Sequence, residues 1–185
     1  MKTKVHRWFP LIKMLLIGAL VLSNIYIGMR HPDEASAHMF LPHWHKGGAA
    51  IHLGVWNFGV YSAEADRAIR DHFNKISLLY WDYPNAHTDI SVYDETRADG
   101  EGCGYEDPVQ NDGIHLTHSH VVFNRNCAGD TNFIQGIFCQ ELGHAWGQDH
   151  HNEQNSCMGL TYQNQNGYYI TDHDNLDFTD RYRYH

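Results

Sequence analysis

Basic residues are scarce in this chain of 185 residues, where 13 Lys and Arg stand against 22 Asp and Glu for a formal net charge of −9. Several of the few basic residues, including Lys2, Lys4 and Arg7, lie at the N-terminus, so the rest of the chain is more acidic still. Proteins that bind nucleic acid usually present a basic surface to the phosphates. The charge balance therefore argues against a nucleic-acid partner.

Cysteine is also sparse, with four residues and no C-x-x-C pair, which argues against a cysteine-based metal site. An even count favours two disulfides in a secreted chain, as the N-terminal segment described below predicts, and four cysteines allow three pairings. We favour the sequential pairing, Cys103–Cys127 and Cys139–Cys157. Each bond would close a loop of about 20 residues, which stabilises a fold by on the order of 3 kcal/mol in the chain-entropy model.

Long apolar runs are almost absent outside the N-terminus, where residues 11–29 are mostly apolar after a basic start. Residues 35–37 read Ala-Ser-Ala, a small-x-small pattern typical of a signal-peptide cleavage site. The sequence therefore predicts a signal peptide over 1–37 and one secreted domain over 38–185. We expect that domain to be monomeric.

The alternative for the leader is an uncleaved anchor, because a membrane-spanning helix needs about 20 apolar residues. In that case the domain would be anchored to a membrane and face outward. Any membrane contact would then run through the N-terminal segment alone.

Periodicity along 38–185 predicts an α/β domain in which a mixed, twisted sheet packs on two main helices. Strand composition appears early, a 3.6-residue apolar stripe follows Ser62, and a late helix can be capped by Asp130, Thr131 or Asn132. The acidic, Gly-containing stretch between the second and third strands reads as a loop. The expected elements are strand 49–58, helix 62–80, strand 88–93, loop 95–113, strand 114–124, helix 133–146 and helix 172–182.

One helix carries a pattern with metal-binding spacing. Gln140 and His144 are four residues apart, which places both side chains on one helical face about 6 Å apart. Glu141 is adjacent, and Gly147 can end the helix in the left-handed conformation, so that the chain folds His150 back toward His144. Three such donors and a water would make the tetrahedral, open site of a catalytic zinc.

These residues follow the signature H-E-x-x-H-x-x-G-x-x-H, except that Gln140 stands where the first histidine is expected. Met158, in Ser-Cys-Met-Gly, lies eight residues after His150, where a Met turn would fall. The chain thus resembles the metzincin clan of zinc metallopeptidases, and within it the matrixin-like secreted enzymes. The resemblance implies a single domain with a sheet helix, an active-site helix and a small C-terminal subdomain that contains the Met turn.

The resemblance also implies an activity, the hydrolysis of peptide bonds in a peptide or protein substrate by a zinc-activated water. Gln140, His144 and His150 would hold one zinc, and Glu141 would act as the general base. Met158 would form an apolar floor beneath the ligands. Strand 114–124 would match the edge strand that lines the cleft, and Tyr162 is a further candidate after the Met turn.

The glutamine leaves three alternatives open, because an amide oxygen is a poorer zinc donor than imidazole nitrogen. Gln140 binds through its oxygen, or another histidine (His118, His120 or His151) completes the site. In the third, the protein is a catalytically silent relative that binds peptide or cell-surface material. A metal-scavenging protein is a further reading of the 16 histidines, although it leaves the ordered signature unexplained.

Weaker patterns suggest other metals. His87-x-Asp89, with His115 or His118 as later ligands, could form a second zinc site. Calcium could bind in the acidic stretch, since hard carboxylates suit it. Its candidate ligands are Asp94, Glu95, Asp99, Glu101, Glu106 and Asp107. We expect His43 and His45 to be surface residues.

Overall fold

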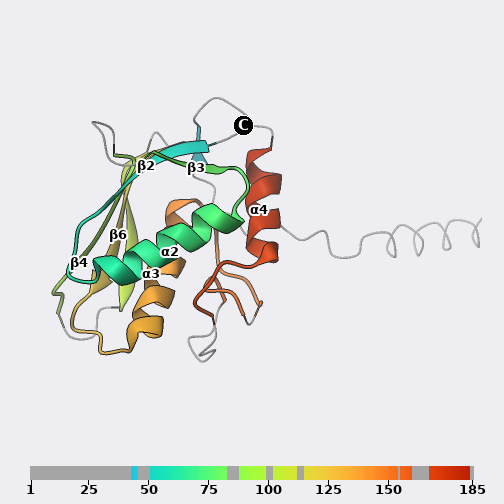
Figure 1. Cartoon of the computed structure of the whole chain (residues 1–185). Helices are drawn as coiled ribbons and strands as arrows, with labels where there is room; N and C mark the ends of the chain where they lie inside the picture. Colours follow the sequence, from blue (N-terminus) through green and yellow to red (C-terminus); the bar gives the residue numbers. More distant parts are fainter. Residues whose placement is uncertain are drawn as a thin grey trace, which may run out of the picture. The chain divides into compact units, whose positions relative to one another are not determined.

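The computed structural model describes residues 43–45, 51–82, 88–98, 102–111, 115–153, 155–159 and 167–183 (Figure 1). All of them belong to the unit Ala37–His185, and the predicted signal peptide lies outside the described residues. Among the described residues, none of the helices combines the length and apolar character needed to cross a membrane.

A mixed sheet forms the first layer of the domain. Along it the strands run β1-β6-β4-β2-β3, with parallel pairing between neighbours, and β5 pairs antiparallel with β6. Leu116 of β6 pairs with Trp44 of β1 and with Asn111 of β5, so these two strands lie on opposite sides of β6. The bounds are β1 His43–Trp44, β2 Ile51–Asn57, β3 Leu79–Asp82, β4 Ile90–Glu95, β5 Gly104–Asn111 and β6 His115–Asn124.

Two helices, α2 (Ser62–Lys75) and α3 (Thr131–Ala145), pack against the sheet and against each other (Figure 1). The buried stripe of α2 contains Ala65, Ala68 and Ile69, as its 3.6-residue period predicts. The third helix, α4, spans Asp172–Tyr182 as predicted, and a capping box at Thr171 starts it. The α/β class and the two main helices are therefore confirmed.

The predicted loop 95–113 is wrong in part, because β5 occupies Gly104–Asn111. This strand contains Gly, Asp, Glu and Pro108, which have poor strand propensity, and pairing with β6 overrides that preference. Proline is tolerated there because β5 has β6 on one side in the described sheet. The prediction that 114–124 is the edge strand is consequently wrong: β6 lies between β4 and β5.

Two further expectations are wrong. Helix α2 ends at Lys75 rather than Tyr80, because Ile76 takes an extended conformation (ψ 104°) and the chain turns directly into β3. The lead-in before β2 is not a surface segment throughout, since His43 and Trp44 are buried while His45 is exposed. Both errors come from tertiary pairing with strands that are distant or later in the chain.

Both predicted disulfides are present, Cys103–Cys127 and Cys139–Cys157. The first joins the start of β5 to the turn after β6. The second joins α3 to the segment that contains Met158. Disulfides persist in oxidising compartments, so these bonds fit an extracellular protein.

Candidate metal centre

Helix α3 begins and ends at residues that the sequence specifies. The Asp130 side chain accepts a hydrogen bond from Phe133 N (2.9 Å), so the N-cap is one of the three predicted candidates. At the other end Gly147 has φ 93°, a left-handed conformation that favours glycine. Gln148 N then donates to Gly143 O (2.9 Å), which reverses the chain. The reversal carries His150 back over the last two turns of the helix.

Two side chains from other elements donate hydrogen bonds to the buried carbonyls at the end of α3. Trp44 Nε1 donates to Ala145 O (2.6 Å), and Tyr182 Oη donates to Trp146 O (2.7 Å). Tyr182 Oη also accepts from Trp44 N (3.1 Å). Because the last carbonyls of a helix have no intrahelical donor, these bonds fix the point where the chain turns toward His150.

The three predicted donors converge at this turn. Gln140 Nε2 lies 3.4 Å from His150 Nδ1, and the rings of His144 and His150 are 4.6 Å apart between centroids. Two atoms that each lie about 2.0–2.1 Å from a tetrahedral zinc are about 3.3 Å apart. The separation between the Gln140 amide and His150 therefore matches that of two ligands of one ion. A rotation of the amide group would present its oxygen in place of its nitrogen.

His144 is oriented by a backbone carbonyl. Its Nδ1 lies 2.9 Å from Gln148 O, so Nδ1 carries the proton and Nε2 retains its lone pair. Burial lowers the pKa of His144, and the neighbouring His150 adds to that effect. The imidazole is therefore neutral at neutral pH, which is the form that binds a metal. Gln140, His144 and His150 are therefore a candidate donor set for a metal ion, with two imidazole nitrogens and one neutral amide oxygen.

Glu141, the residue after Gln140 on α3, has a buried side chain that lies against strand β5. Its side chain is 6% exposed, and its Oε1 is 2.8 Å from the place where a Cβ on Gly104 would stand. Burial raises the pKa of Glu141 to about 8, and the charge of Glu106 contributes a smaller part. Glycine at position 104 lets strand β5 approach the carboxyl group that closely. A side chain there would displace Glu141 or push β5 away from α3.

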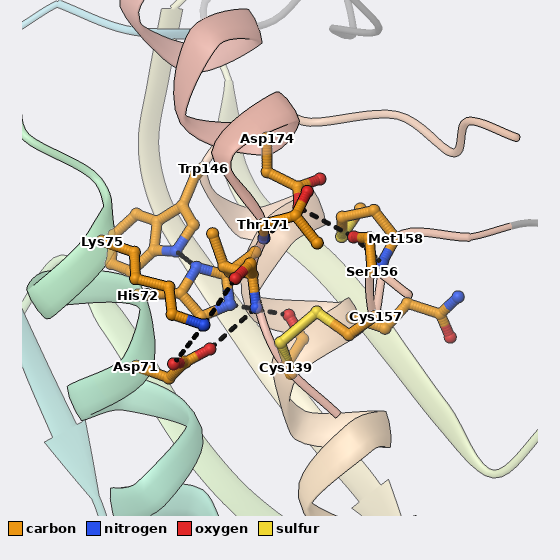
Figure 2. The surroundings of a disulfide bond; sticks show 12 residues. Asp71, His72, Lys75, Cys139, Trp146, Ser156, Cys157, Met158, Thr171 and Asp174 are labelled. Atoms are coloured by element: carbon orange, nitrogen blue, oxygen red, sulfur yellow. Dashed lines mark hydrogen bonds and ion pairs between the residues drawn. A yellow bond between two sulfur atoms is a disulfide. The ribbon is translucent and has the colours of Figure 1, made fainter. Parts of the chain in front are cut away.

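Met158, the predicted Met-turn residue, packs against helix α3. It is fully buried, and its sulfur lies directly against Gly143, one residue before His144. The disulfide between Cys139 and Cys157 fastens this turn to α3 one residue from Gln140. Figure 2 shows this disulfide between α3 and the segment that carries Ser156 and Met158.

His72 lies against the same disulfide, and its ligand atom and those of Cys139 and Cys157 are within 4.8 Å of one another. Both sulfurs are bonded to each other, however, so neither is a thiolate ligand. Both ring nitrogens of His72 are also engaged: Trp146 Nε1 donates to Nδ1 (2.8 Å), and Nε2 donates to Cys139 O (2.9 Å) (Figure 2). His72 thus joins α2 to α3 through hydrogen bonds.

The buried imidazole of His72 predicts a loss of stability in mild acid. Burial lowers its pKa from 6.5 to about 4, so below pH 6.5 the unfolded chain binds a proton that the folded chain does not. At about 1.4 kcal/mol per pKa unit, the free energy of unfolding should fall by roughly 3 kcal/mol between pH 6.5 and pH 4. Urea unfolding of wild type and His72→Gln at both pH values measures this term. If the free energy of unfolding falls by the same amount in wild type and His72→Gln, the loss does not come from His72.

The other predicted histidines lie elsewhere on the sheet. Val121 and Phe123 of β6 face the helices, with Phe123 5.7 Å from Phe138 of α3 between ring centroids, so the alternating residues His118 and His120 face the other way. His118 Nδ1 lies 3.0 Å from Thr88 O, and the His120 ring packs on Tyr93. The structure does not bring these two histidines to Gln140. His151 is buried and bonded to Asp174.

The ligands expected for a second zinc and for calcium do not converge on one point among the described residues. Asp89 is buried and accepts from Gly54 N (2.8 Å), while His115 packs against His43 and His45. Of the calcium candidates, Asp94 pairs with Arg125, Glu95 accepts from Tyr105 Oη, and Glu106 accepts from Ser119 Oγ, whereas Asp107 is exposed. His87, Asp99, Glu101 and Tyr162 lie outside the described residues.

Three residues around the centre were not predicted from the sequence, namely His72, Gly104 and Asp174, and Glu106 was expected only as a calcium ligand. Gly104 and Glu106 belong to β5, which the composition did not reveal as a strand. His72 did have a signal, because it lies in the apolar stripe of α2, where a polar side chain must find buried partners. Asp174 had one as well, since it occupies the third position of a capping box with Thr171.

Comparison with known proteins finds a likeness of fold. No family model matches the chain, and no curated protein matches it. Among solved structures, the fold is similar to that of myroilysin, a metzincin-type metalloprotease, with a TM-score of 0.51 and 11% sequence identity. The match covers 78% of this chain and 97% of the myroilysin chain. The chain therefore has a metzincin-like fold, in which a mixed sheet packs on helices.

Proposed function

We propose that this chain is a secreted, matrixin-like zinc endopeptidase. The observation that carries the proposal is the convergence of Gln140, His144 and His150 at a separation suited to one ion. Glu141, which follows Gln140 on the same helix, supplies a buried carboxyl group. A likeness of fold to a metalloprotease supports the same class. The leader and the two disulfides are consistent with secretion.

Each residue has a defined part in the hydrolysis. Gln140 Oε1 and one nitrogen each of His144 and His150 would hold the zinc, which when bound would polarise the scissile carbonyl and lower the pKa of water to about 7. Glu141 would accept the proton of the attacking water and then pass it to the leaving amine. A positive ion nearby would also lower the raised pKa of Glu141 and favour the carboxylate that the first step requires.

The substrate would lie along β5. This strand pairs with β6 on one side, and its residue Gly104 lies against Glu141. An extended peptide that adds to β5 as a further strand would satisfy its own backbone groups there. Its scissile bond would then pass the general base. In this proposal β5, and not 114–124, is the edge strand that lines the substrate cleft.

A digestion assay tests the proposal. The full chain, supplied with zinc, should cleave casein or gelatin, and a chelator should stop the reaction until zinc is restored. Activity that is unaffected by the chelator would contradict the metal mechanism. Zinc-dependent binding of the protein substrate without cleavage would instead favour the catalytically silent relative. Gln140, a poorer zinc ligand than the histidine of the signature, is the residue that raises this alternative.

A further inference from the structure

Asp174, in the first turn of α4, is fully buried and accepts hydrogen bonds from three different segments. Its Oδ1 accepts from His151 Nε2 (2.6 Å), and its Oδ2 accepts from Ser156 Oγ (2.8 Å). Oδ2 also accepts from Thr171 N (2.6 Å) and Thr171 Oγ1 (2.8 Å), which is its capping role. Its backbone carbonyl accepts from Gln148 Nε2 (2.8 Å). Helix capping accounts for only part of this set.

The remaining bonds lead to the candidate metal centre. Gln148 and His151 lie on either side of His150, the ligand that follows the reversal of the chain. Ser156 Oγ accepts from Met158 N (2.9 Å), and His151 N donates to Met158 O (3.1 Å). A closed ring of contacts therefore runs from His151 through Asp174 and Ser156 to Met158 and back. Figure 2 shows Asp174, Thr171, Ser156 and Met158 together above the disulfide.

The direction of the bond from His151 is fixed by its second ring nitrogen. Glu153 N donates to His151 Nδ1 (3.1 Å), so Nδ1 is an acceptor and Nε2 carries the proton that Asp174 Oδ1 accepts. Both ring nitrogens of His151 are thus engaged, Nδ1 by the following loop and Nε2 by α4. A buried carboxylate is costly unless donors surround it, so the ring of contacts is a specific arrangement that tolerates little change.

We propose that Asp174 is a positioning residue for the metal centre, which holds His150 and the Met turn in the geometry that zinc binding requires. The inference rests on the proposed function, because it assigns a role toward the same zinc. In this role α4 supports the segment that contains His150, in addition to closing the domain. Removal of a group that orients a metal ligand typically lowers metal affinity by about 10- to 100-fold.

Asp174→Asn breaks the contact with His151 selectively. The amide oxygen of the new side chain can still accept from Thr171 and Ser156, so the helix cap is retained. Its NH2 group then faces the N–H of His151, and His151 cannot switch tautomer because Glu153 N needs Nδ1 as an acceptor. We expect the zinc Kd of the full chain, measured in competition with a chromophoric chelator, to rise at least about tenfold.

Two matched variants separate positioning from general loosening. Asp71→Asn makes the same chemical change in a carboxylate whose partners are Ile170 N (2.7 Å), just before α4, and Lys75 Nζ (3.0 Å) on its own helix. It should leave the zinc Kd within about twofold of wild type. His151→Gln combined with Asp174→Asn offers a carbonyl oxygen to the new amide, so it should recover part of the lost affinity.

The outcomes distinguish this proposal from the proposed function. If wild type binds zinc and Asp174→Asn binds it equally tightly, the positioning role is overturned and the endopeptidase proposal stands. Equal losses in Asp174→Asn and Asp71→Asn, with no recovery in the double variant, also overturn it. If wild type binds no zinc at Gln140, His144 and His150, both proposals fail together.

Discussion

Glu141→Gln should lower the rate of peptide-bond cleavage by about 10²- to 10⁴-fold, the usual contribution of a positioned general base. Glutamine has nearly the same shape as glutamate but cannot accept the proton of the attacking water. Since Glu141 is not one of the three converging donors, zinc binding should be unchanged. Casein digestion and zinc titration of wild type and Glu141→Gln measure the two effects separately. Full activity in the variant would remove Glu141 from the mechanism.

The same substitution has a second readout in the metal-free protein. Burial raises the pKa of Glu141 from 4.5 to about 8, so the folded state disfavours the charged carboxylate. The protonated Glu141 carboxyl group therefore stabilises the folded state at low pH. As pH rises from 4.5 through 8, the free energy of unfolding should fall by up to a few kcal/mol, at about 1.4 kcal/mol per pKa unit. Metal-free Glu141→Gln should lack this loss. Its advantage over wild type in urea unfolding should thus be larger at pH 8 than at pH 5.

Gln140→His should tighten zinc binding by at least about 10- to 100-fold, because imidazole nitrogen is a far better zinc donor than an amide oxygen. The helix already places position 140 on the face of His144, and the amide of Gln140 lies 3.4 Å from His150. The variant therefore completes the histidine set without moving the backbone. Cleavage at limiting zinc should rise in parallel. A chelator competition assay measures the affinity.

Gln140→Ala is the matched control for this experiment. Alanine removes the amide oxygen and keeps the helix, so zinc binding should weaken relative to wild type. If alanine, glutamine and histidine at position 140 all give the same Kd, this position does not contact the ion. In that case another group completes the site, and position 140 of the signature has no part in metal binding.

Local signals were sufficient for the elements that carry the ligands. The Asp130 cap and the left-handed Gly147 each act within a few residues, so both could be predicted from the sequence. The disulfide between Cys139 and Cys157 is likewise short in sequence, with a separation of 18 residues. The convergence of Gln140, His144 and His150 could therefore be predicted from their spacing alone.

Long-range packing decided what the sequence could not predict. Strand β5 has unfavourable composition and exists through its pairing with β6, and the burial of Trp44 depends on Ala145 and Tyr182 about a hundred residues or more later. The raised pKa of Glu141 follows from the approach of β5 at Gly104. For the same reason, the electrostatic environment of the site was not visible in the signature itself.

A crystal structure of the protein grown with zinc, with data recorded on both sides of the zinc absorption edge, tests the central claim most directly. The account predicts one anomalous peak within about 2.0–2.2 Å of Gln140 Oε1 and of one nitrogen on each of His144 and His150. Glu141 should lie outside bonding distance of the ion. A vacant position between these three side chains, or zinc held only at His118 and His120, would contradict it.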